Sequence, residues 1–150
     1  MTAVELSLFL RRGTMLKAVL PDIPAQQRHF LVVANANPRL DDRVYLVLIT
    51  SKRDASDRVI RRMNESPETL VVIPNLPSFP GQTAISYVNC NQVFAKTFAE
   101  LIDMFNRERT TPCQDMPSAI MDMIERGILA SRQTTDAVKM AVASTPNVTA

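Results

Sequence analysis

The chain has few of the residues from which familiar active sites are built. It has one histidine, two cysteines, three glycines and no tryptophan among 150 residues. One histidine and two separated cysteines cannot complete a structural zinc site from this chain alone. No glycine-rich phosphate loop, nucleophile elbow or H-E-x-x-H motif occurs. These absences exclude the common nucleotide-binding, serine-hydrolase and zinc-protease designs.

Long apolar runs and export signals are also lacking. No run of eighteen apolar residues occurs, so no transmembrane helix is expected. The opening segment, MTAVELSLFLRRG, has no basic residue before its apolar stretch and no small-residue cleavage site, so no signal peptide is expected. We therefore expect a cytoplasmic protein in which Cys90 and Cys113 are reduced thiols.

Paired carboxylates occur in segments with turn chemistry. They lie in Asp41–Asp42 and in the DASD stretch at 54–57, where aspartate is common for conformational reasons. We predict no metal site and no cofactor.

The net charge of +2 is unevenly distributed. Residues 1–62 contain 11 Lys and Arg against 6 Asp and Glu, whereas residues 63–150 contain 6 against 9. Such an asymmetry is typical of a protein with an anionic ligand on one side. The alternative is an ordinary solvated surface whose charges cluster by chance.

The first ninety residues have the pattern of short strands. Five runs rich in apolar, β-branched and aromatic residues lack helical spacing, and they lie at 14–20, 29–35, 43–50, 69–75 and 83–89. Asn, Pro and Asp between the second and third runs predict a hairpin. The segment 53–67 is ambiguous between a helix and a short strand in a loop.

The last sixty residues have the pattern of helices. Thr97 and Glu100 form a capping box, and further helices are expected at 116–130 and 134–143. Consecutive strands without crossover helices cannot form a parallel sheet. We predict one α+β domain, mainly β: a small antiparallel barrel or strongly curved sheet of about five strands within 1–92, helices over 97–143 packed outside it, and a disordered tail at 144–150.

Polar and basic side chains lie at the two ends of the predicted hairpin that meet at one edge of the sheet. They are Arg28, His29, Thr50, Ser51, Lys52 and Arg53. A guanidinium beside hydroxyls suits a phosphate, because its planar fork of donors matches phosphate oxygens. The alternative is that these residues are strand-end caps in contact with solvent.

The same segment resembles the MazF/PemK family of toxin–antitoxin ribonucleases. The matching stretches are QQRHFLVVANAN and RVYLVLITSK, while LRRGTMLKAVL resembles the family's opening strand and TAISYVNCNQVFAKTFAELI its late strand and helix. The resemblance covers residues 11–105 and aligns Arg28 and Thr50 with the family's catalytic Arg and Thr or Ser. It implies an SH3-like barrel that forms homodimers and cleaves single-stranded RNA without an obligatory metal.

The resemblance also implies a mechanism. The ribose 2′-hydroxyl attacks the adjacent phosphorus and leaves a cyclic phosphate and a 5′-hydroxyl. Arg28 would stabilise the phosphorane and act as acid, and Thr50 would orient the phosphate. His29 is the candidate base, because an arginine does not easily lose its proton. The alternative for His29 is that it caps a sheet edge.

Contacts to RNA are expected from the basic half of the chain. The candidate residues are Arg12, Gln27, Ser51, Lys52 and Arg53, with Arg58, Arg61 and Arg62 farther along. An antitoxin protein is the expected partner. Because His29 stands where the family usually has proline and fold does not determine function, the alternative is a catalytically inactive SH3-like barrel that binds a partner protein or nucleic acid.

Overall fold

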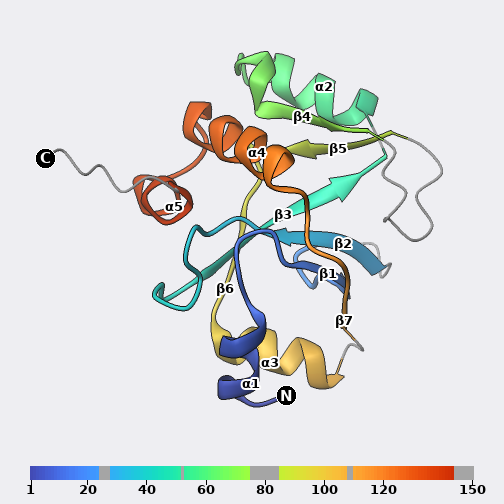
Figure 1. The fold of residues 1–150 in the computed structure, drawn as a ribbon. Helices are drawn as coiled ribbons and strands as arrows, with labels where there is room; N and C mark the ends of the chain where they lie inside the picture. Colours follow the sequence, from blue (N-terminus) through green and yellow to red (C-terminus); the bar gives the residue numbers. More distant parts are fainter. Residues whose placement is uncertain (24–27, 52, 75–84, 108–109, 144–150) are drawn as a thin grey trace, which may run out of the picture.

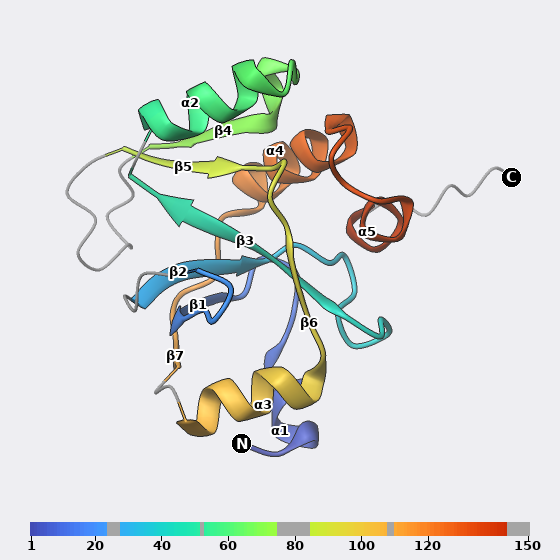
Figure 2. The ribbon, with the colours of Figure 1, turned by 180° about the vertical axis from the view of Figure 1, so that it is seen from behind.

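The computed structural model describes residues 1–23, 28–51, 53–74, 85–107 and 110–143. In these ranges the chain forms one antiparallel sheet with helices on both of its faces, as Figure 1 and Figure 2 show. The α+β class and the antiparallel pairing are as expected. The expected tail at 144–150 lies outside the described residues.

In the described ranges the sheet contains seven strands. They are β1 (Met15–Val19), β2 (Arg28–Val33), β3 (Val44–Thr50), β4 (Leu70–Ile73), β5 (Ser86–Asn89), β6 (Phe94–Lys96) and β7 (Thr111–Pro112). Their order is β4-β5-β3-β2-β1-β7, and β6 pairs with the first half of β3. The predicted hairpin of β2 and β3 is confirmed.

The sheet is open, with β4 and β7 at its two ends among the described strands. Of the two expected forms, a barrel or a curved sheet, the closed barrel is not formed, and seven strands in the described ranges stand where about five were expected. The physical reason is that both apolar faces of the sheet are buried against helices, so no closure of the sheet on itself is needed to bury them.

Five α-helices flank the sheet in the described ranges. They are α1 (Ala3–Phe9), α2 (Arg53–Arg62), α3 (Phe98–Arg107), α4 (Ser118–Ala130) and α5 (Asp136–Val142). The ambiguous segment is thus a helix, followed by a 3-10 turn at Pro67–Thr69. None of the helices in the described ranges has the length and apolar content to cross a membrane.

The caps of two helices show how local sequence begins them. At α3, the Thr97 hydroxyl accepts from the amide of Glu100, and the Glu100 carboxylate accepts from the amide of Thr97, both at 3.1 Å, as predicted. Thr2 and Glu5 form the same reciprocal pair at α1. This helix is not among the sequence-based expectations, because the opening segment stands out only as an apolar stretch.

Side-chain alternation along β2 divides the core into two clusters. Val32 belongs to the cluster that packs on α4 and α5, whereas Leu31 and Val33 belong to the cluster that packs on α1 and α3. The two helix pairs consequently lie on opposite faces of the sheet, as Figure 1 and Figure 2 show.

Candidate nucleic-acid interface

The start of β2 and the end of β3 lie at the same end of the sheet because the two strands are antiparallel. Their paired stretch ends at Phe30 and Ile49, and beyond it β2 and β3 diverge, as Figure 1 and Figure 2 show. Past this point each strand keeps a different neighbour. Arg28 pairs with Val19 of β1, and Thr50 pairs with Tyr87 of β5.

The Arg28 side chain is exposed and turns toward β1 and β7. Its Nη2 donates to the carbonyl oxygen of Lys17 at 3.3 Å and to Oγ1 of Thr111 at 2.5 Å. Lys17 is itself paired with Phe30, and its Nζ lies 5.2 Å from the centroid of the Phe30 ring. Two cations therefore lie on one face near the start of β2. Their positive electrostatic potential attracts an anion such as a phosphate.

The charges of Lys17 and Arg28 both act on the thiol of Cys113. Burial raises the pKa of Cys113, and the positive charges of Lys17 and Arg28 act in the opposite direction. Both cations are thus close enough to influence the same thiol, which follows β7 along the chain.

The alternation of side chains along each strand places Thr50 and His29 on the other face of the sheet. His29 precedes Leu31 by two residues and Thr50 follows Leu48 by two, and both leucines belong to the α1–α3 side of the core. Arg28 is one residue before His29 and lies on the opposite face. Nε2 of His29 is buried and has no hydrogen-bond partner among the described residues. The structure therefore brings His29 and Thr50 to one face and Arg28 to the other.

Two residues at this end of the sheet were missed by the sequence analysis. Tyr87 pairs with Thr50, and Ser86 begins β5 one residue earlier; each is buried, with 8% of its surface exposed. Tyr87 adds a phenol on the face of Thr50, whereas the Ser86 hydroxyl lies on the opposite face by the same alternation. The sequence shows only that an apolar run begins with polar residues. It does not show that this run lies beside Thr50, because the pairing of β3 with β5 joins segments far apart in the chain.

The other predicted RNA contacts are distributed unevenly. Ser51 follows β3 and is exposed, and Arg53 begins α2. Gln27 and Lys52 lie outside the described residues.

Arg12 lies at the opposite end of the β1–β2 ladder from Arg28. The ladder begins with Met15 and ends with Val19, which pairs with Arg28. Nη2 of Arg12 is 3.0 Å from Asp122 and 3.5 Å from Glu125, both on α4, and 19% of the Arg12 side chain is exposed. The structure thus uses Arg12 to hold α4 and does not place it beside Arg28.

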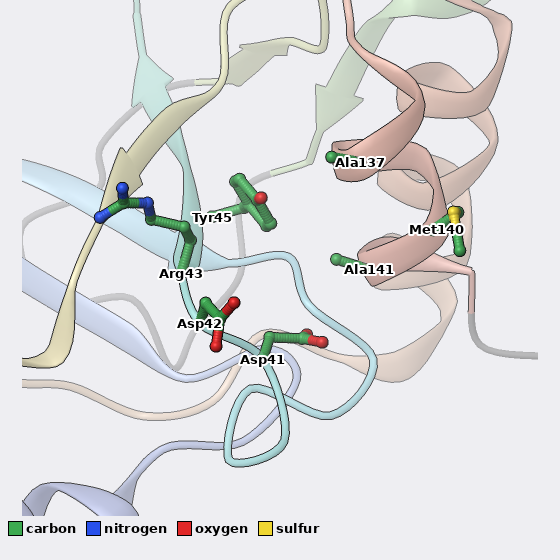
Figure 3. A pocket seen from close by; sticks show the side chains of 7 residues that line it. All are labelled: Asp41, Asp42, Arg43, Tyr45, Ala137, Met140 and Ala141. Atoms are coloured by element: carbon green, nitrogen blue, oxygen red, sulfur yellow. The ribbon is translucent and has the colours of Figure 1, made fainter.

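A hollow of about 370 Å³ lies near the start of β3, away from Arg28. Figure 3 shows its lining residues, which are Asp41, Asp42, Arg43, Tyr45, Ala137, Met140 and Ala141. Two carboxylates line it, and the Arg43 side chain points away from α5 in Figure 3. Because carboxylates repel a phosphodiester, we do not assign this hollow to RNA.

In the described ranges no three or more His, Cys, Asp or Glu side chains are grouped to hold a metal ion.

The fold and this strand end together define an antiparallel α+β protein with a cationic edge. No family model matches the chain, and no curated protein matches it. Among solved structures it is similar to an endoribonuclease from Mycobacterial species, with 19% identity, a TM-score of 0.49, and coverage of 81% of this chain and 88% of that chain.

Two crystal forms of MazE-MazF from Deinococcus radiodurans are also similar to it. Each has 10% identity and covers 81% of this chain; the two cover 92% and 94% of their own chains, with TM-scores of 0.47 and 0.49.

Proposed function

We propose that this chain is a MazF/PemK-like toxin that cleaves single-stranded RNA without a metal ion. The observation that carries the proposal is the antiparallel pairing of β2 with β3, which sets Arg28 and Thr50 of the family-like segment at one end of the sheet. Arg28 is exposed there and has Lys17 near it, so cationic charge is available for a phosphate.

The proposed reaction is an internal transfer of the phosphoryl group from the 5′-oxygen to the 2′-oxygen. The ribose 2′-oxygen loses its proton to His29 and bonds to phosphorus, and the bond from phosphorus to the 5′-oxygen breaks. Arg28 donates hydrogen bonds to the charged phosphorane and to the leaving oxygen, which takes its proton from water because an arginine does not easily lose one, while Thr50 orients the phosphate. Because His29 and Thr50 lie on the face opposite Arg28, the RNA strand passes across the end of the sheet between them.

The proposed partners follow from the same resemblance. RNA is the substrate, an antitoxin protein is the inhibitor, and the chain forms a homodimer in the cytoplasm. Ser51, Arg53, Gln27 and Lys52 remain the proposed RNA contacts around the strand end. Size-exclusion chromatography with light scattering tests the dimer separately from the chemistry.

A catalytically inactive domain that binds a partner protein or nucleic acid is the second candidate. It is favoured by two observations. Arg28 already donates to Thr111, and alternation separates the Arg28 and Thr50 side chains onto different faces.

A cleavage assay separates the two candidates. Purified full chain is incubated with mixed-sequence single-stranded RNA, with and without a chelator. We expect equal cleavage in both, products that carry a cyclic phosphate, and a loss of roughly 100-fold or more in Arg28→Ala and Thr50→Ala. Arg107→Ala, which removes an exposed arginine of α3, is the matched control. RNA that stays intact with the wild-type chain would reject the nuclease and favour the second candidate.

A further inference from the structure

We propose that Thr111 of β7 is a positioning residue for Arg28, so that the C-terminal half of the chain completes the site. This inference rests on the proposed function. It goes beyond it because the family-like segment ends before β7, and nothing in the sequence connects Thr111 with Arg28.

The contact joins residues that are 83 positions apart in the chain. Nη2 of Arg28 donates to Oγ1 of Thr111 at 2.5 Å and to the carbonyl oxygen of Lys17 at 3.3 Å. A guanidinium has five N–H donors, so a hydroxyl can hold it while it also donates to a ligand.

Thr111 is itself held firmly against β1. It pairs with Lys17, and two residues later the amide of Cys113 donates to the carbonyl oxygen of Met15 at 2.9 Å. On the other side, the Thr110 hydroxyl donates to the carbonyl oxygen of Met104 at 3.1 Å. The Thr111 hydroxyl is therefore attached to a backbone with little freedom.

A fixed hydroxyl matters because Arg28 is long and exposed. Such a side chain samples many rotamers and loses them when it must meet a phosphorane in one geometry. A hydrogen bond that already restricts the guanidinium lowers that entropic cost in the transition state. Thr111 thus acts through Arg28 and touches no reacting atom.

The test compares Thr111→Val, Thr111→Ser and the nearby Cys113→Ser in the RNA cleavage assay with chelator. For Thr111→Val we expect kcat to fall about five- to tenfold with KM nearly unchanged, as for the loss of one hydrogen bond of ordinary net strength. Thr111→Ser retains the hydroxyl and keeps the wild-type kcat, as does Cys113→Ser. In an Arg28→Lys background, Thr111→Val produces no further fall, because the two residues act as one unit.

The outcomes also separate this inference from the proposed function. If Arg28→Ala abolishes cleavage but Thr111→Val matches the wild type, or exceeds it, only the positioning role is wrong. Equal losses in Thr111→Val and Thr111→Ser, together with a lower unfolding temperature, would assign Thr111 a structural role and overturn the inference. A wild-type chain without cleavage overturns the proposed function and this inference with it.

Discussion

Gly127 of α4 packs directly on Cys90, which follows β5. A Cβ atom at position 127 would stand 2.6 Å from Sγ of Cys90 and 2.9 Å from the carbonyl oxygen of Glu68. A Cβ atom does not approach non-bonded heavy atoms so closely. Only glycine therefore allows α4 to lie at this depth on the sheet. The helix that covers one face of the sheet is therefore positioned by the absence of a side chain.

We predict that Gly127→Ala destabilises the chain although it lies within a helix. Alanine is favoured over glycine in a helix interior by about 1 kcal/mol, but overpacking costs about 1–3 kcal/mol, and the Glu68 carbonyl cannot rotate away. Urea unfolding should show a net loss of up to roughly 2 kcal/mol. Adding Cys90→Ala should recover part of that loss. A more stable Gly127→Ala variant would show that the close contact does not constrain α4.

Glu65 should make the stability depend on pH in the acid range. Its buried carboxylate accepts from the Arg132 amide and from Nε2 of Gln133. Burial alone would raise the pKa of Glu65, but these hydrogen bonds and the Arg132 charge outweigh it and lower the pKa below its ordinary value of 4.5. A lowered folded-state pKa gives stability that is present above about pH 4.5 and is lost as the pH falls through the folded-state pKa.

The measurement is the unfolding free energy of wild type and Glu65→Gln between neutral and acid pH. We expect the variant to be less stable at neutral pH and to lose less stability on acidification. Glu68→Gln, which changes an exposed carboxylate nearby, is the control. Parallel pH profiles for wild type and Glu65→Gln would contradict the assignment.

The two thiols should differ in reactivity. Burial raises the pKa of Cys90 to about 12, so very little of it is thiolate at pH 8, and none of its surface is exposed. Cys113 is partly exposed. In the native chain, a thiol-specific disulfide reagent at pH 8 should modify Cys113 rapidly. It should modify Cys90 only after the chain unfolds. Rapid modification of a native Cys113→Ser variant would show that Cys90 is accessible.

Substitutions at Arg12 and Arg28 should have different effects. The first should lower stability, and the second should weaken RNA binding. Because Arg12 pairs with Asp122 and Glu125, Arg12→Ala should cost about 1 kcal/mol of unfolding free energy and leave RNA affinity unchanged. Arg28→Ala should weaken binding of a non-cleavable deoxy-substituted RNA and leave stability nearly unchanged. Anisotropy and urea unfolding of both variants provide the measurement. Weaker RNA binding by Arg12→Ala would return that residue to the interface.

Several elements could be predicted because their signals are local. The runs at 29–35 and 43–50 correspond to β2 and β3, and the Thr97–Glu100 capping box begins α3. The strands β6 and β7 were missed, because segments of three and two residues have no detectable period. Whether the sheet closes into a barrel could not be predicted, because the number of strands does not show which apolar faces the helices cover.

The amino-acid sequence by itself determined the hairpin and thus the end of the sheet at which Arg28 and Thr50 lie, because a turn and two flanking apolar runs are neighbours in the chain. Only the tertiary structure decided what each of them contacts. The pairing of β1 with β7 gives Arg28 its bond to Thr111, and the pairing of β3 with β5 sets Thr50 beside Tyr87. These pairings join distant segments through packing of the whole sheet, which no local pattern encodes.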